Sequence, residues 1–404
     1  MGQGTIVPMS SAPSSSAVRV SGGGKALAGF LLSGFLMALL GAILPAWGYH
    51  RDPPDFAAVG NYFLALAVGI VVAAWCGRRV AERQGVTFLL VSACVLSCLS
   101  LLYLAMVSPP AGEWWRVGGL LALGIGAGLL NLALFSAISP SYRSDVAGTV
   151  NRGGAWYGLG CVAATLLVAG TFYVYTVPSI LIFMAVMPAV FGGMYLQTTF
   201  APRASGAEPD MRQALNDFRT AGAVLFALLL FVQFGNEWSI AGWLPIFLIR
   251  RVGLSPLAAL VILALYWTFL MAGRLAAVAI LPRVRHGRLL LGSGASALLG
   301  CFILFWTNNE FGAGMGAFFI GAGYASIYPL VAEAIGRRFP YYHPGFFNGI
   351  FSFALLGGLL APASLGYAAT ALGVGVVIGI PLVGTCVVML LLILIWLESK
   401  MTGR

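Results

Sequence analysis

One carboxylate lies in a stretch of sequence where a charge is costly. Glu237 is near the middle of the apolar run 221–248, and two amides, Gln233 and Asn236, precede it on the same run. A charge in hydrocarbon costs at least about 2.5–3.5 kcal/mol, so such a residue faces a partner or a water-filled cavity. Residues four apart share a helix face, which places Gln233 beside the carboxylate. We expect Glu237 to exchange a proton or to accept hydrogen bonds from substrate hydroxyls; a structural ion pair with Arg274 is the alternative.

Polar and aromatic residues at similar depth in other apolar runs suggest a polyhydroxylated solute. Sugars present apolar C–H faces that stack on aromatic rings, and hydroxyl rims that need paired donors and acceptors. The predicted substrate-binding residues are Gln233, Asn236, Glu237, Trp243, Tyr266, Trp267, Asn131, Tyr324 and Asn348. Tyr328 and Trp156 are further candidates for stacking, and Asn151 for an amide contact. For each aromatic residue taken alone, helix packing or a place at the membrane interface is the alternative.

A second set of charged residues is expected to serve gates or structure. Its members are Glu82, Arg83, Arg152, Arg274, Glu333 and Arg337. Glu333 precedes Arg337 by one helical turn, so an ordinary ion pair explains it, with a gate contact as the alternative. Arg274 is expected to anchor its helix by pairing with a carboxylate, and direct contact with substrate is the alternative.

The composition indicates that these residues lie within a membrane. Hydrophobic residues make up 60% of the 404 and charged residues 8%, whereas a soluble domain carries roughly a quarter charged residues. The chain is therefore an integral membrane protein, for which a net charge of +10 says nothing about nucleic acid, and no nucleic-acid partner is expected. The six cysteines have no paired spacing, so neither disulfides nor a metal site is expected.

Twelve apolar runs are each long enough to cross a bilayer, which takes about 20 residues in a helix. They are 26–48, 57–77, 86–107, 115–139, 146–170, 175–197, 220–248, 255–281, 288–307, 311–335, 345–370 and 374–397. Of the 22 Lys and Arg residues, 16 fall on the side of both chain ends and 4 on the other side. The positive-inside rule then makes both ends cytoplasmic, in a multi-pass protein of a bacterial-type inner membrane.

Short patterns recur between the two halves of the chain. An Arg-x-Gly pattern at 83–85 recurs at 285–287, Leu-Pro at 44–45 recurs at 244–245, and IGAG at 125–128 recurs at 320–323. The offsets of 202, 200 and 195 residues predict a duplicated unit. The predicted domains are a disordered cytoplasmic tail at 1–24, six-helix bundles at 25–197 and 220–397, a cytoplasmic linker at 198–219 and a tail at 398–404. Such repeats are typical of secondary transporters, whose site lies between the halves.

These stretches resemble the major facilitator superfamily, and in particular its fucose–glucose–galactose proton symporters and related sugar permeases. The resemblance rests on Glu82-Arg83-Gln84-Gly85, the GNEW stretch at 235–238, Tyr266-Trp267 followed by Gly273-Arg274, GYASIYP at 323–329 and GGLLAP at 357–362. It implies an all-α fold of twelve transmembrane helices in two pseudo-symmetric six-helix bundles. Those symporters typically carry a carboxylate in helix 1 and often one in helix 4. Here helix 1 has no acid and helix 4 has Asn131, so proton coupling would rest on other groups.

We therefore predict a monomeric secondary active transporter that moves a sugar or similar small polar solute by alternating access, coupled to protons through Glu237. No cofactor is expected, and the lack of nucleotide-binding and hydrolase motifs argues against an enzyme. The alternatives are an uncoupled sugar uniporter, a proton-driven efflux carrier for lipophilic compounds, and an organic-anion carrier using Arg274 and Arg152. A non-transporting membrane sensor or scaffold is the alternative from another class.

Overall fold

The computed structural model describes residues 22–144, 146–200, 218–280, 283–284, 286–338 and 349–401. Every regular element in these ranges is helical. The helices are α1 (Gly22–Ile43), α2 (Phe56–Met106), α3 (Glu113–Ser144), α4 (Val146–Thr171), α5 (Val177–Leu196), α7 (Ala221–Phe247), η1 (Leu248–Val252), α8 (Pro256–Ile280), α9 (His286–Trp306), α10 (Glu310–Ala325), α11 (Ile327–Arg338), α12 (Gly349–Leu372) and α13 (Val376–Met401).

Eleven helical segments of the described chain are long and apolar enough to cross a membrane. One of them, α2, has 51 residues and contains a break at Gly85, whose backbone angles are φ 82° and ψ 170°. Only glycine adopts this backbone region readily, so Gly85 permits the break. The break divides α2 into two crossings. Helices α10 and α11 together form one crossing, Glu310–Arg338. The predicted twelve crossings are thus all present, and the two crossings within α2 are separate helical segments that meet at the Gly85 break.

Some predicted boundaries differ from the structure and others lie outside the described residues. Helix α1 begins at Gly22, inside the predicted tail 1–24, and α13 continues to Met401, inside the predicted tail 398–404. Apolar runs define only the part of a helix within hydrocarbon, whereas the backbone hydrogen bonds continue beyond it. Residues 1–21, 201–217 and 402–404 of the predicted tails and linker are not among those described.

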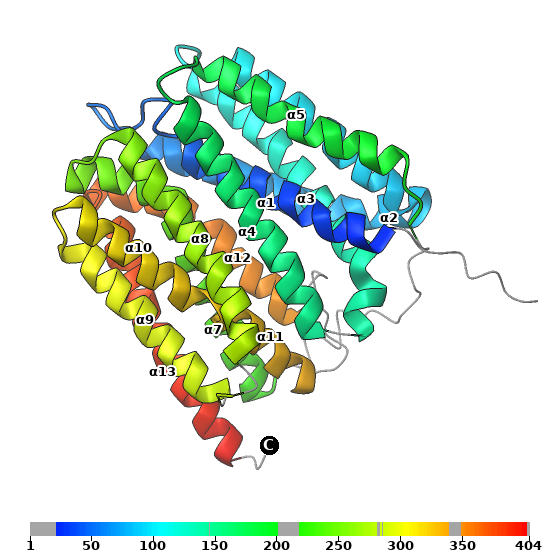
Figure 1. Cartoon of the computed structure of the whole chain (residues 1–404), viewed down its shortest axis with the longest axis vertical. Coiled ribbons are helices and arrows are strands. Elements are labelled where there is room, and N and C mark those ends of the chain that lie inside the picture. Colours follow the sequence, from blue (N-terminus) through cyan, green and yellow to red (C-terminus); the bar gives the residue numbers. More distant parts are fainter. Residues whose placement is uncertain are drawn as a thin grey trace, which may run out of the picture.

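The helices form two bundles, α1–α5 and α7–α13, that lie side by side (Figure 1). The packing within one bundle repeats in the other: α1 packs against α4 as α7 packs against α12, and α2 contacts α5 as α9 contacts α13. Between the bundles, α4 packs against α8, and the first part of α2 packs against α12. These two seams flank the central space in which the site lies. We call the side where α1 begins and α13 ends the terminus side, and the opposite side the loop side.

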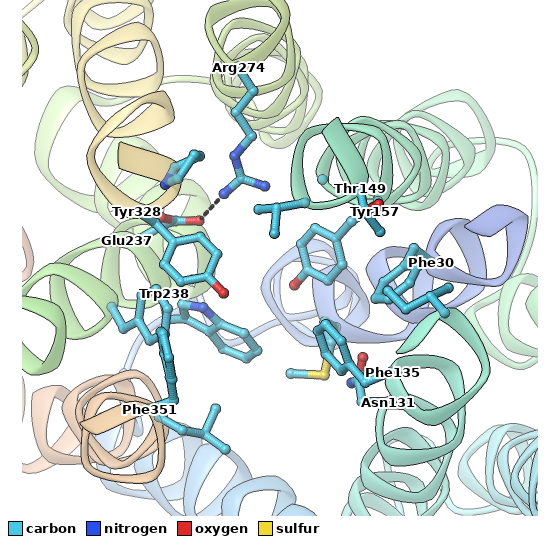
Figure 2. Close-up of a pocket in the computed structure, with 18 of the residues that line it drawn as sticks. Phe30, Asn131, Phe135, Thr149, Tyr157, Glu237, Trp238, Arg274, Tyr328 and Phe351 are labelled. Carbon is cyan, nitrogen blue, oxygen red and sulfur yellow. Dashed lines mark hydrogen bonds and ion pairs between the residues drawn. The ribbon is translucent and has the colours of Figure 1, made fainter. Parts of the chain in front are cut away.

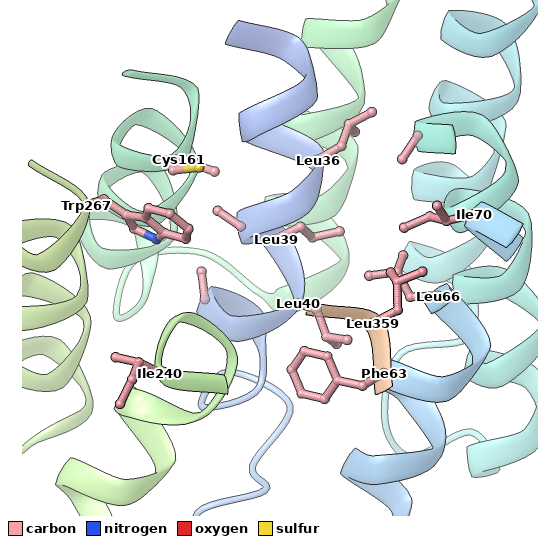
Figure 3. Packing of buried hydrophobic residues seen from close by; sticks show 14 of the residues in the cluster. Leu36, Leu39, Leu40, Phe63, Leu66, Ile70, Cys161, Ile240, Trp267 and Leu359 are labelled. Carbon is pink, nitrogen blue, oxygen red and sulfur yellow. The ribbon is translucent and has the colours of Figure 1, made fainter. Parts of the chain in front are cut away.

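The two bundles close against each other on the loop side. An apolar plug, defined as Leu40, Phe63, Leu66, Trp243 and Leu359, is buried there. Figure 3 shows Leu40, Phe63, Leu66 and Leu359 gathered where the two bundles meet. Trp243 stacks on Phe63 with ring centroids 6.0 Å apart and donates a hydrogen bond to the Pro362 carbonyl at 2.9 Å. The plug separates the central space from the loop side.

Polar contacts reinforce this closure nearer the loop-side surface. Arg250 of η1 forms a 2.6 Å ion pair with Asp52, in the connection between α1 and α2. Tyr367 of α12 donates a 2.6 Å hydrogen bond to Asn61 of α2. Both contacts join the first bundle to the second, so opening the loop side would require both to break.

Candidate functional site

A cavity of about 220 Å³ lies between the bundles (Figure 2). Its lining residues run from mid-depth towards the terminus side. Both bundles line it, through α1, α2, α3 and α4 on one side and α7, α8, α11 and α12 on the other. Aromatic rings form much of its wall: Phe30, Phe135, Tyr157, Phe234, Trp238, Tyr328 and Phe351. Polar side chains in the wall are fewer: Asn131, Thr149, Glu237 and Arg274. The cavity is therefore amphipathic, with apolar faces and a small number of placed polar groups, as is typical of small-molecule sites.

The charged centre of the site is an ion pair between α7 and α8. Arg274 Nη2 lies 3.2 Å from Glu237 Oε1, and the two residues are 7% and 4% exposed. The pair is held by a single contact, because Glu237 Oε2 and Arg274 Nε are buried without hydrogen-bond partners among the described residues. A buried pair of this kind holds two opposite charges at low dielectric, and removing one partner leaves the other uncompensated.

Arg274 also reaches across to the first bundle. A Cβ atom placed at Gly154 of α4 would lie 3.1 Å from Arg274 Nη1, so the absent side chain makes room for the guanidinium. The ion pair consequently sits at the α4–α8 seam, where the two bundles meet. A change in its protonation would be felt by both bundles.

Hydroxyl, amide and indole groups line the same cavity as the ion pair. Figure 2 shows the hydroxyls of Tyr157 and Tyr328 pointing into the cavity from opposite bundles, with the Trp238 indole below them. The Tyr328 hydroxyl and the Trp238 indole nitrogen make no hydrogen bond to any described residue, so both remain available to a bound solute. Asn131 accepts a 2.7 Å hydrogen bond from Ser33 at its amide oxygen, which orients its amide nitrogen as a donor.

Two of the predicted substrate-binding residues, Glu237 and Asn131, line this cavity. The structure places six others outside its wall. Tyr266 lies behind Glu237 and donates to its backbone carbonyl at 3.2 Å, and Tyr324 hydrogen-bonds Thr385 at 2.8 Å within the second bundle. Trp243 belongs to the plug, and Trp267 packs edge-on against Tyr157.

The remaining predicted amides differ in position. Gln233 and Asn236 are 0% and 4% exposed inside the second bundle, where both polar atoms of Gln233 and the amide nitrogen of Asn236 have no partner among the described residues. Asn236 faces α13, since its oxygen would lie against a side chain added at Gly384. Asn348 lies outside the described residues.

The residues predicted to serve gates and structure lie mostly at the terminus side. Glu333 pairs with Arg337 at 2.5 Å and with His286 at 3.4 Å, so it joins α11 to α9. Arg152 is exposed on α4, and its Nε donates to the Gly148 carbonyl at 3.0 Å. Glu82 and Arg83 are exposed beside the Gly85 bend. Arg274 differs from these, because it lies in the cavity wall.

Sequence reasoning missed several residues of the wall: Trp238, Tyr157, Phe30, Phe135, Phe234 and Phe351. Trp238 directly follows Glu237. A search for residues four apart from Glu237 selects Gln233, which is buried inside the second bundle, and does not select Trp238. On α7, Phe234 and Trp238 share the cavity face with Glu237, whereas Trp243 lies on another face. Tracing the face that runs through 234, 237 and 238 could have found this side of the cavity.

Comparison with known proteins is decisive for the family. Residues 27–362, most of the chain, match the family model described as Major Facilitator Superfamily. The chain belongs to this superfamily. It is therefore a multi-pass membrane transporter by family, and the twelve-helix, two-bundle fold expected from the sequence is confirmed. An uncharacterized MFS-type transporter of Yersinia pestis is 24% identical over 370 residues, which cover 90% of this chain and 91% of the relative.

Solved structures of superfamily transporters share the fold at low sequence identity. A D-xylose-proton symporter superposes with a TM-score of 0.73 at 14% identity, covering 92% of this chain and 96% of the symporter. The nucleoside transporter NupG gives 0.68 at 15%, covering 92% and 99%. The superfamily transporter FucP in its outward conformation gives 0.64 at 14%, covering 93% and 99%.

Proposed function

We propose that this superfamily transporter carries a sugar or a similar small polar solute by alternating access, and that Glu237 couples the movement to protons. The observation that supports this most directly is the Glu237–Arg274 pair in the wall of a central cavity between the bundles. An intramembrane ionisable pair at a cavity marks a substrate or ion pathway more often than a structural brace. Secondary transporters place both the substrate site and the coupling-ion site at this depth.

The conformation supports the alternating-access part of the proposal. The cavity reaches towards the terminus side, while the plug and the Arg250–Asp52 and Asn61–Tyr367 contacts close the loop side. With both chain ends in the cytoplasm, as the Lys and Arg distribution indicates, this is the inward-facing state. Transport would then alternate between this state and one in which the plug opens.

The groups in the cavity suit a ring-shaped solute with hydroxyls. The Trp238 ring offers a stacking face, and the hydroxyls of Tyr157 and Tyr328 and the amide of Asn131 offer hydrogen bonds to a polar rim. Arg274 can donate a hydrogen bond to a hydroxyl oxygen of the solute. The structural neighbours include a xylose–proton symporter and a nucleoside transporter, which is consistent with such a solute.

Coupling follows from the charge balance of the pair. While Glu237 is ionised, its charge holds the Arg274 guanidinium at 3.2 Å. Protonation removes that charge and frees the guanidinium to donate to an oxygen of the solute. The cation left in the wall is then stabilised by the solute, so proton and solute favour each other's binding.

The aromatic wall supports a second candidate, a proton-driven carrier of lipophilic compounds. Seven rings from both bundles face the cavity, and apolar solutes need few hydrogen bonds to bind there. Inhibition of transport by free sugars separates the candidates, since a lipophilic carrier is insensitive to them.

Uptake into proteoliposomes tests the proposal. A panel of labelled monosaccharides, nucleosides and lipophilic cations would be offered with and without an inward proton gradient, to wild type, Glu237→Gln and the exposed control Glu310→Gln. Gradient-driven accumulation of a sugar that becomes equilibration in Glu237→Gln, but not in Glu310→Gln, is the expected result. A wild type that moves no sugar under either condition would contradict the sugar assignment.

A further inference from the structure

The Gln233 side chain has an environment that its chemistry does not explain. It is fully buried in α7, and neither its amide oxygen nor its amide nitrogen has a hydrogen-bond partner among the described residues. Buried side-chain polar atoms are paired in the large majority of cases, and each exception calls for a physical reason. Gln233 lies one helical turn from Glu237, on the same face of the helix, with Cβ atoms about 5–6 Å apart in a regular helix.

Glu237 also has a buried polar atom without a partner. Arg274 binds its Oε1, while Oε2 is buried and unpartnered. An ionised carboxylate only accepts hydrogen bonds, so it would satisfy the Gln233 nitrogen and leave the amide oxygen unpaired. A protonated carboxyl both donates and accepts, so it can satisfy the nitrogen and the oxygen of one amide together.

We propose that Gln233 is the partner of protonated Glu237: on taking up a proton, the carboxyl turns from Arg274 to the Gln233 amide and forms two hydrogen bonds with it. The Glu237 hydroxyl donates to Gln233 Oε1, and Gln233 Nε2 donates to the Glu237 carbonyl oxygen. The proposal deepens the proposed function and rests on its proton coupling. Gln233 acts as a positioning residue that holds the neutral carboxyl away from Arg274.

Among the groups that face one another here, Glu237 is the one whose charge changes on protonation. The titratable groups facing Glu237 are Arg274 and Tyr266 on α8, Tyr157 and Cys161 on α4, and Tyr328 on α11. Arginine stays charged at physiological pH, and tyrosine titrates near 10 in its ordinary state. The protonation of Glu237 therefore sets the electrostatic state of the site, and the Gln233 amide can both donate to and accept from its acid form.

Gln233→Met tests this, because methionine keeps the length and flexibility of glutamine and lacks its amide. The readout is the pH titration of the carboxyl C=O infrared band of the purified protein, assigned to Glu237 by its loss in Glu237→Gln. Ser239→Ala is the matched control: Ser239 is 1% exposed, and its hydroxyl is also unpartnered among the described residues of α7. This control removes a buried polar group of α7 that lies on a different helix face from Glu237.

Gln233→Met is expected to move the midpoint of the band about one pH unit to lower pH, a tenfold change in the protonation equilibrium. The band should also shift to higher frequency, since a carboxyl C=O that loses its hydrogen bond stretches at higher frequency. Ser239→Ala should change neither quantity.

Three results would overturn the proposal: an unchanged midpoint in Gln233→Met, an equal shift in Ser239→Ala, or the absence of a Glu237 acid band in the wild type at any pH. Failure of the proposed function looks different. If the infrared shift occurs but wild-type proteoliposomes show no proton-dependent uptake, the coupling is wrong and the Glu237–Gln233 pairing stands.

Discussion

Trp243 offers a quantitative test of the loop-side closure. Its indole is fully buried between Phe63, stacked at 6.0 Å, and Phe56, edge-on at 6.1 Å, both on α2 of the opposite bundle. Each aromatic pair contributes about 0.5–1.5 kcal/mol beyond its area burial, so the two contacts between bundles are worth about 1–3 kcal/mol. Trp243→Ala should therefore raise the ratio of the loop-side-open state to the closed state by about 5- to 150-fold.

Spin labels on the loop side measure this ratio without assuming which side faces the cytoplasm. Labels at Arg51 and Leu372, exposed residues of the first and second bundles, would report the separation of the bundles as a distance distribution. Trp243→Ala should add a longer distance that is minor or absent in the wild type.

Trp243→Phe is the control, because it keeps a ring against α2 and loses only the bond to Pro362, within its own bundle. Its distance distribution should stay close to that of the wild type. Wild-type distances in Trp243→Ala would refute the reasoning that these rings hold the bundles together.

Three further predictions follow from the contacts. The Arg250–Asp52 pair should show a coupling energy of only about 0–1 kcal/mol in a double-mutant cycle on the same distance measurement, because the Asp52 side chain is 80% exposed; a coupling well above this range would mean that the pair is screened from water. Gly154→Ala should lower the uptake rate several-fold by crowding Arg274, whereas Gly153→Ala, whose Cβ meets ordinary contacts with Phe30, should lower it less; equal rates would contradict the role of the α4–α8 seam. Tyr328→Phe should raise the KM of the transported solute by up to about tenfold, since one hydrogen bond contributes about 0.5–1.5 kcal/mol; an unchanged KM would remove Tyr328 from the site.

The fold could be predicted from the sequence because the membrane imposes it. Hydropathy locates spans wherever backbone groups must be satisfied within a helix, and the recurrences between the halves indicated the two bundles. The Glu237–Arg274 pair could also be anticipated, because few charged residues lie within the apolar runs and charged residues within a membrane pair with one another. From the sequence, this pair is a structural alternative for Glu237, and the structure places it in the cavity wall.

The rest of the site could not be predicted, because most of the helices that build it have no distinct polar face. In a soluble helix the polar face marks the outside, but α7 is surrounded by other helices and carries no such mark. Trp238 and Trp243 are five residues apart, so they point in different directions, and one lines the cavity while the other closes the loop side. Which residue does which depends on how the bundles are placed, which the local sequence does not encode.

The central claim is that Glu237 carries the proton that drives the solute. The most direct test is the proton flux evoked by adding solute to proteoliposomes without a gradient, measured with a pH dye beside solute counterflow in the same preparation. We predict that the wild type takes up protons with the solute, and that Glu237→Gln performs counterflow with no proton uptake. Solute-evoked proton uptake that persists in Glu237→Gln would contradict the account.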